Sequence, residues 1–158
     1  MKQLSLILLT FLLFACGGDA FEKEKQKLIR NHELREANYQ QLRDNYQMRI
    51  GDYHNVRDAH EAAMAKAYTD SLHVAINATH ELLEQNHVAF FKKHDEILEQ
   101  HKGLKARMDV EGYAPESIRE DFIQMEKDYV KLEREFGYIN AEVTQMIEEQ
   151  TGMLDEFQ

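Results

Sequence analysis

The last third of the chain repeats apolar residues at alternating steps of four and three. From Ile118 onward, eleven of twelve positions in this series are apolar, whereas the overall hydrophobic content of 43% would give about five. Gln150 is the single polar member. A series sustained for so many heptads is typical of a long helix that packs against a partner along its whole length. The series is Ile118, Phe122, Met125, Tyr129, Leu132, Phe136, Ile139, Val143, Met146, Gln150, Met153 and Phe157.

The start of this helix is marked by residues that end and begin helices. Gly112 can terminate a preceding helix, Pro115 suits a first helical turn, and Ser117 with Glu120 forms a capping-box pattern. We therefore expect a turn over residues 111–116 and a helix over about 116–157.

Upstream, residues 22–110 contain no proline and show two heptad registers. The first row is Tyr39, Tyr46, Tyr53, His60, Ala67 and Val74, flanked by Leu42, Val56 and Ala63. The second row is Ile76, Leu83, Phe90, Ile97 and Leu104. The register changes near Tyr68–Ser71, which indicates either a connection between two helices or a stutter in one long helix. The pattern favours helices over about 22–68, 71–110 and 116–157.

The predicted fold is therefore all-α: an elongated antiparallel bundle or coiled coil of two or three long helices. The alternative to three helices is one long helix folded back by a shorter one. In both arrangements the apolar rows must pack on each other or on another subunit, so self-association or a protein partner is expected.

The N-terminus has the pattern of an export signal. Lys2 precedes an apolar run from Leu4 to Phe14, which is too short to remain as a membrane span. The run ends in Leu13-Phe14-Ala15-Cys16, which resembles the bacterial lipobox. The resemblance implies cleavage after residues 1–15, acyl chains such as palmitate on Cys16, a lipidated tether over 16–21 and a helical domain over 22–158. Phe14 departs from the smaller residue usual in the motif. The alternative is an ordinary secretory signal with an incidental cysteine.

Charge restricts the partners of the exported part. The chain has 19 basic and 29 acidic residues, a formal charge of −10, and loss of residues 1–15 would leave −11. Such a surface disfavours nucleic acid, so the expected partners are a lipid bilayer, through the acyl chains, and protein. The lipobox places the protein in the bacterial cell envelope, and Gly17 after the cysteine favours the outer membrane by resemblance to the sorting pattern of enteric bacteria.

Five of the eight histidines share one heptad position, each three residues before a member of the Ile76–Leu104 row. They are His73, His80, His87, His94 and His101. One interpretation makes them packing residues at the edge of the seam, with a ring nitrogen in water or on a glutamate. A second makes His80, Glu84 and His87 candidate metal ligands, because Glu84 lies within one helical turn of both; Glu-x-x-His is also the spacing of di-iron bundles. A third makes the row pH-sensitive, because half-burial lowers histidine pKa values and would loosen the packing near about pH 5.

Other chemistry is sparse. The chain has no nucleophile elbow, phosphate-binding glycine loop or zincin motif, so we expect no enzyme and no cofactor beyond the covalent lipid, with metal as the open question. Asp70-Ser71-Leu72 resembles the O-glycosylation pattern of Bacteroidota, which makes Ser71 a candidate acceptor. The lipobox followed by acidic helices resembles small α-helical coiled-coil lipoproteins of that group. The expected function is a non-enzymatic binding, spacing or scaffold module; the alternative is a periplasmic metal-binding or metal-sensing protein using the His73–His101 row.

Overall fold

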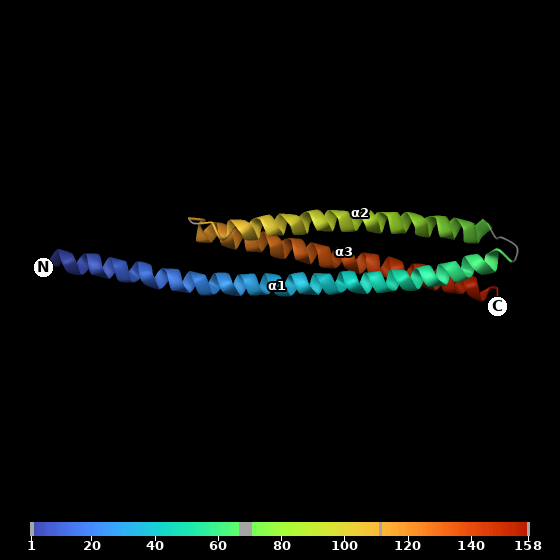
Figure 1. The fold of residues 1–158 in the computed structure, drawn as a ribbon, viewed down its shortest axis with the longest axis horizontal. Helices are drawn as coiled ribbons and strands as arrows, with labels where there is room; N and C mark the ends of the chain where they lie inside the picture. Colours follow the sequence, from blue (N-terminus) through green and yellow to red (C-terminus); the bar gives the residue numbers. More distant parts are fainter. Residues whose placement is uncertain (1, 67–70, 111, 158) are drawn as a thin grey trace.

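Three long helices make up the computed structural model, which describes residues 2–66, 71–110 and 112–157, with side chains from residue 20 onward. They are α1 (Lys2–Met64), α2 (Ser71–Arg107) and α3 (Pro115–Asp155). Successive helices run in opposite directions along one axis, so the bundle is up-down-up (Figure 1). The prediction of an all-α elongated bundle is confirmed, and the three-helix arrangement is the one observed. Tyr68 and Asp70, at the predicted change of register, lie outside the described residues.

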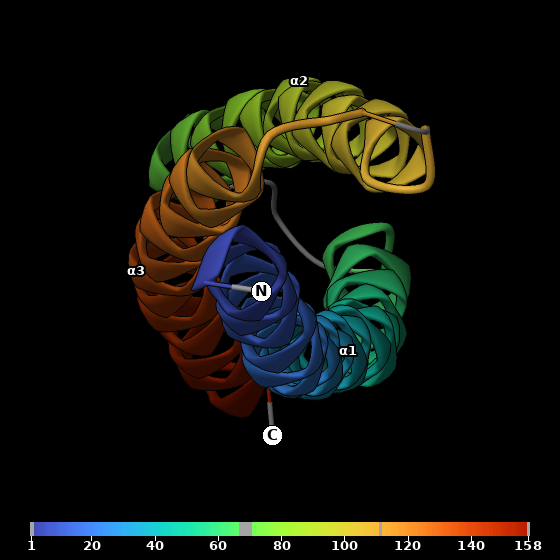
Figure 2. The same cartoon turned by 90° about the vertical axis from the view of Figure 1, so that its left-hand side faces the viewer.

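The helices are not equally close to one another. Viewed along the axis, α3 lies beside both other helices, while α1 and α2 stand farther apart (Figure 2), and α3 packs more closely on α1 than on α2. The first turns of α1 extend past the end of the bundle formed by α2 and α3 (Figure 1). Among the residues with described side chains, no helix has an apolar stretch long enough to cross a bilayer.

The apolar series of α3 forms the centre of the bundle, as predicted. Eleven of its members, from Ile118 to Met153, are the buried residues of this helix, and Gln150 is as buried as its apolar neighbours. The members from Tyr129 to Met146 pack against Tyr39, Tyr46, Ile50 and Tyr53 of α1 to form the main core cluster, whereas Ile118, Phe122 and Met125 form a second cluster with Met108. Burial of this continuous face is the chief stabilising contribution, because free energy follows the apolar area removed from water.

The start of α3 differs from the sequence prediction in its capping. Gly112 has a positive φ of 85°, which ends the preceding turn and suits glycine. The N-cap, however, is Ala114, and no side chain caps the helix. Pro115 occupies the first turn, which places Ser117 inside the helix rather than at its cap. The predicted capping box of Ser117 and Glu120 is therefore wrong, because the helix begins earlier than the Ser117 pattern implied.

The inward face of α2 also differs from the prediction. Its fully buried residues are the five histidines, whereas the aliphatic row from Ile76 to Leu104 is only half-buried. Val74, expected to continue the row of α1, is 50% exposed. The centre of the buried face is thus one position away from Val74, on His73, because the histidines find hydrogen-bond partners on both neighbouring helices.

Candidate functional site

The five histidines of α2, here called the histidine row, face five acidic residues of α3. Each histidine places Nε2 within hydrogen-bond or ion-pair distance of one carboxylate oxygen. The pairs are His73–Glu156 at 3.2 Å, His80–Glu149 at 2.7 Å, His87–Glu142 at 2.8 Å, His94–Glu135 at 3.0 Å and His101–Asp128 at 3.1 Å. The acidic residues, here called the carboxylate row, are themselves seven apart. Because α2 and α3 are antiparallel, a step of seven forward on one helix matches a step of seven backward on the other.

On α1 a third set of residues repeats at seven, and it contacts the other ring nitrogen of His73, His87 and His94. This α1 row is His32, Tyr39, Tyr46, Tyr53 and His60. The hydroxyl of Tyr39 lies 2.8 Å from Nδ1 of His94, and the hydroxyl of Tyr46 lies 3.3 Å from Nδ1 of His87. With Nε2–H donated to a carboxylate, Nδ1 is left to accept the tyrosine O–H. Tyr, His and Glu are thereby linked in series across the bundle.

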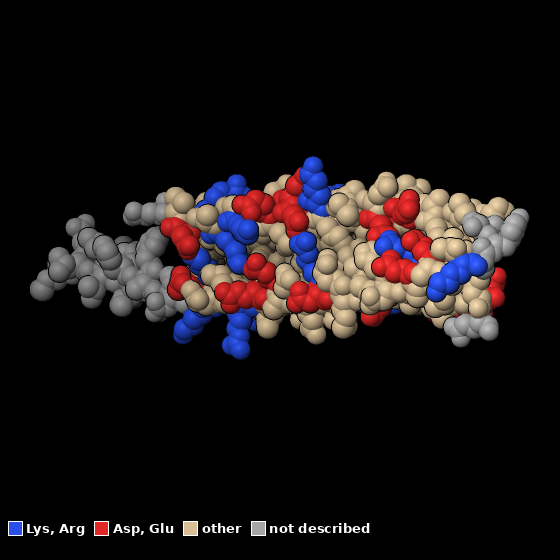
Figure 3. Space-filling model, turned by 45° about the vertical axis from the view of Figure 1, so that its right-hand side comes forward, with Lys and Arg blue, Asp and Glu red and all other residues tan. Residues whose placement is uncertain are grey.

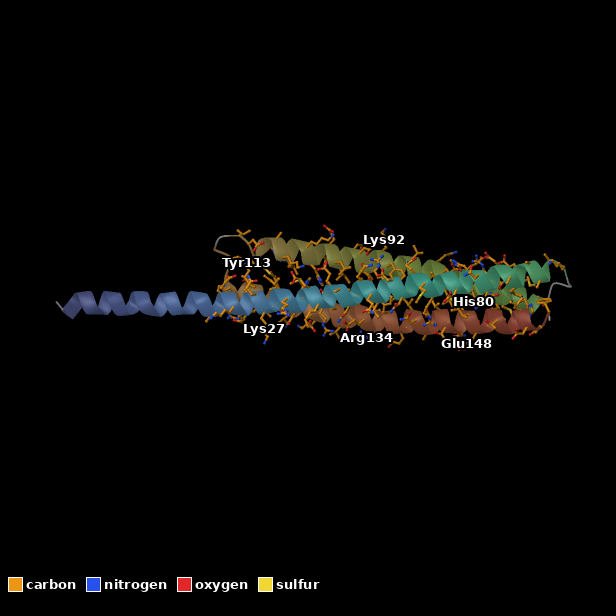
Figure 4. The ribbon with its side chains drawn as sticks, turned by 60° about the horizontal axis from the view of Figure 1, so that its bottom comes forward. Lys27, His80, Lys92, Tyr113, Arg134 and Glu148 are labelled. Carbon is orange, nitrogen blue, oxygen red and sulfur yellow. The ribbon has the colours of Figure 1, made fainter. Side chains whose placement is uncertain are left out.

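The three rows form five layers stacked along the axis. In each layer the member of the histidine row is at most 3% exposed. The exposed fraction of the carboxylate side chains ranges from 14% at Glu135 to 66% at Glu156. The charged group therefore stays at the water-facing edge while the imidazole spans the interior, which avoids the cost of burying a charge. Figure 4 shows the labelled His80 between the helices, while the labelled Lys27, Lys92 and Arg134 project outward.

Gln150 joins the two layers nearest the α1–α2 connection. Its Oε1 lies 2.7 Å from Nδ1 of His60, and its Nε2 donates to Asn77 at 2.6 Å and lies 3.1 Å from Nδ1 of His80. In the same region Nε2 of His60 is 3.2 Å from Nδ1 of His73. The buried amide of Gln150 thus pairs with His60, Asn77 and His80, whose polar atoms would lose this partner if the position held a leucine. This explains why the apolar series of α3 is interrupted at Gln150.

The layer at the opposite end, formed by His32, His101 and Tyr129, has unpartnered polar atoms. Both ring nitrogens of His32, Nδ1 of His101 and the hydroxyl of Tyr129 are buried and make no hydrogen bond to the described protein atoms. Burial, followed by the positive charge of Lys105, lowers the pKa of His32 to about 4. His32 is therefore neutral at neutral pH.

Other titratable groups follow their surroundings. Burial lowers the pKa of His94, although the Glu135 carboxylate acts in the opposite direction. Burial also raises the pKa values of Tyr39 and Tyr46 to about 12, so both hydroxyls remain protonated donors. Of the predicted pH-sensitive row, His94 is the member for which desolvation dominates. The wider hypothesis of a pH-sensitive row stays a prediction.

The predicted metal ligands His80, Glu84 and His87 are not brought together. Glu84 turns toward α1, where its carboxylate lies 2.7 Å from Nε2 of His54 and 3.3 Å from the guanidinium of Arg57. His80 and His87 instead point to separate carboxylates of α3. In the part of the chain that the structure describes, no three His, Cys, Asp or Glu side chains are gathered to hold a metal ion.

The two predicted modification sites lie toward opposite ends of the elongated molecule (Figure 1). Cys16 falls within α1, and its side chain lies outside the described residues. The predicted tether over 16–21 is helical in the structure as part of α1. Ser71 is exposed as the first residue of α2, next to Asp70, which is outside the described residues.

Sequence reasoning found the histidine row but missed its partners. Each carboxylate-row residue immediately precedes a position of the α3 series, so Asp128 adjoins Tyr129 and Glu135 adjoins Phe136. The shared spacing of seven in acids, histidines and tyrosines was the available signal. It was hidden because acidic residues of α3 also occupy other heptad positions, for example Glu126 and Glu133.

Comparisons with protein-family models, with curated proteins and with solved structures find no match to this chain.

Proposed function

We propose that this protein is a lipid-anchored rod of the bacterial cell envelope that acts by binding, spacing or scaffolding and not by catalysis. The observation that supports this most is the pairing of the histidine row with the carboxylate row. The side chains best suited to acid–base or ligand chemistry hold the helices together, because each Nε2 of the histidine row pairs with a carboxylate of the neighbouring helix.

The shape of the molecule supports a spacing role. α3 has 41 residues, and at about 1.5 Å per residue it spans roughly 60 Å. α1 extends past one end of the bundle, and this extension contains Cys16. A lipid on Cys16 would fix the rod by one end, so the α1–α2 connection would be the part farthest from the bilayer.

The surface supports binding of protein over anionic polymers. Basic and acidic side chains are interspersed with other residues along the face drawn in Figure 3. The net charge is nevertheless −10. A mixed surface of this kind suits specific protein contacts, whereas nucleic acid and acidic headgroups would be repelled.

The anchor is tested by metabolic labelling with a fatty acid in a bacterial host. We expect label on the full chain, loss of label in Cys16→Ser, and a processed N-terminus that begins at Cys16 by mass spectrometry. As a control, Ser5→Ala changes the signal region without touching the motif and should label normally. An unlabelled wild-type chain, or one cleaved at another position, would contradict the anchor.

The scaffold role is tested by photo-cross-linking in the native envelope. Met48, Val88 and Tyr138 are 64%, 69% and 64% exposed and lie on α1, α2 and α3 respectively. A photoreactive residue at each position samples the three outer faces. We expect a discrete protein adduct from at least one face and none from the buried position Leu132. Absence of adducts from all three faces would contradict a binding role.

A further inference from the structure

The layer formed by His32, His101 and Tyr129 breaks the repeating chemistry of the core. In two layers toward the middle of the bundle, a tyrosine of α1 supplies a hydroxyl to Nδ1 of the histidine row. At this end α1 carries His32 instead, and an imidazole reaches less far than a phenol. Nδ1 of His101 consequently has no donor, and four buried polar atoms meet in one layer. Leaving such atoms unpaired in the interior is unfavourable, so a ligand that pairs with them would be stabilising.

The layer at the opposite end shows that two facing histidines need not leave their ring nitrogens unpaired. His60 also replaces a tyrosine of the α1 row, but its Nε2 lies 3.2 Å from Nδ1 of His73, so those rings contact each other directly. The ring centres of His32 and His101 are 5.5 Å apart, with no hydrogen bond between the rings. With metal–nitrogen bonds of about 2 Å and a tetrahedral angle, two imidazoles on one ion have centres roughly 5 Å apart.

We propose that His32 and His101 bind one divalent transition-metal ion, such as Zn²⁺ or Ni²⁺, between α1 and α2. Nδ1 of His101 and a ring nitrogen of His32 are the protein ligands. Water fills the other positions, and the hydroxyl of Tyr129, whose ring centre lies 5.3 Å from that of His32, is placed to hydrogen-bond to such a water. Imidazole nitrogen is a preferred ligand for these ions.

Carboxylates stand behind both ligands. Asp128 is 3.1 Å from Nε2 of His101, which places the proton on Nε2 and leaves the Nδ1 lone pair for the ion. Glu36 is 3.9 Å from Nδ1 of His32 and also binds Lys105 at 3.1 Å, which offsets the positive charge nearest the site.

Two surface grooves give access to this layer. One, of about 600 Å³, lies between α1 and α3 and is lined by His32 and Tyr129 among others. The second, of about 720 Å³, lies between α2 and α3 and is lined by His101 and Asp128. The two grooves therefore bring solvent close to the two proposed ligands, one on either side of α3.

The test is titration of the full chain, in detergent and without a histidine tag, with Zn²⁺ alone and Ni²⁺ alone by calorimetry. We expect one ion per chain with micromolar affinity and a rise in melting temperature. His32→Tyr restores the hydroxyl that Tyr39 and Tyr46 supply, so it should fold and lose binding. Asp128→Asn should weaken binding by roughly 10- to 100-fold while leaving the ligands in place.

Two controls separate this site from the other histidines. His54→Gln removes a half-exposed imidazole on the outer side of α1 and should bind like the wild type. His87→Gln removes a member of the predicted set of His80, Glu84 and His87 and should also retain the ion. No binding at millimolar concentration, or equal binding by His32→Tyr, would overturn the proposal. Lipid labelling does not depend on this site, so the two proposals can fail separately.

Discussion

At the scale of single residues, the core shows how a polar side chain can serve as a packing residue. A buried histidine costs little when both ring nitrogens have partners, and His94 has them in Tyr39 and Glu135. The same side chain is costly when partners are missing, as at His32. Stability should therefore depend more on whether each ring is satisfied than on how deeply it is buried.

Replacement of Tyr39 by Phe tests the hydrogen bond between the Tyr39 hydroxyl and Nδ1 of His94. The change removes the hydroxyl 2.8 Å from Nδ1 of His94 and leaves that buried nitrogen unpaired, at a cost of about 1–3 kcal/mol. Tyr138→Phe makes the same chemical change on a side chain that is 64% exposed and should be nearly neutral. Urea denaturation of the two variants, followed by circular dichroism, gives the comparison. Equal effects would contradict the role of the Tyr39 hydroxyl.

The pH dependence of stability should follow His32. Its pKa is about 4 in the folded chain and about 6.5 when unfolded, so the unfolded chain binds more protons between these values. The contribution is complete above about pH 6.5 and is lost as pH falls toward 4, at about 1.4 kcal/mol per pH unit. Glu36 and Glu126 oppose this shift, whereas Lys105 and His101 support it.

Thermal melts from about pH 7.5 down to about pH 4.5 measure this slope. His32→Tyr should make it shallower, and His54→Gln should leave it unchanged. A wild-type melting temperature that does not fall over this range would rule out the effect.

At the scale of helices, the buried face could be predicted from the sequence where a helix carries one candidate heptad row, and less well where it carries two. α3 buries one stripe of side chains. The series from Ile118 to Met153 was predicted correctly because an apolar residue recurs at every third or fourth position, with Gln150 as the one exception. α2 carries two adjacent heptad rows, and spacing alone does not say which of them points inward. Hydrophobicity favoured the Ile76–Leu104 row, but the structure buries the histidines because α1 and α3 supply partners. Such pairing is a property of three helices together and is absent from any single pattern.

The start of α3 offers a direct test at this scale. Ala114 is an N-cap without a side-chain hydrogen bond, so Ala114→Asp should cap free backbone N–H groups and stabilise the protein by about 1 kcal/mol. Ser117→Ala removes the residue that the sequence pattern nominated as the cap and should change the free energy of unfolding little. A loss of about 1 kcal/mol in Ser117→Ala would restore the capping box.

At the scale of the whole molecule, the rod is held by its interior more than by its surface. Arg35 of α1 pairs with Glu126 and Glu133 of α3, and Arg119 of α3 pairs with Glu24 of α1. These pairs are partly exposed, and surface ion pairs contribute about 0–1 kcal/mol each. They align the helices, while burial of the apolar face of α3 supplies most of the stability.

Removal of one whole layer tests whether the layers are separable units. Deleting residues 43–49, 84–90 and 139–145 together takes out Tyr46, His87 and Glu142 with one heptad of each helix. We expect a folded rod shorter by about 10 Å in small-angle scattering, since seven residues rise about 10 Å. Deleting 84–90 alone leaves α1 and α3 with an unmatched layer and should lower the melting temperature markedly. If the triple deletion is no more stable than the single one, the layers are not independent.

The repetition of Tyr, His and Glu along the axis has a further effect on how the chain finds its alignment. If α2 slid by one heptad, His87 would meet the hydroxyl and carboxylate that His94 meets now, so the middle of the rod is translationally degenerate. Within the three rows, the ends distinguish one alignment from the next: Gln150 with His60 at one end, and His32 at the other. These end positions therefore fix the register of α2 against the other two helices, because the inner layers repeat the same residues. Their substitution would therefore allow a population of slipped, shorter-overlap bundles before it allowed unfolding.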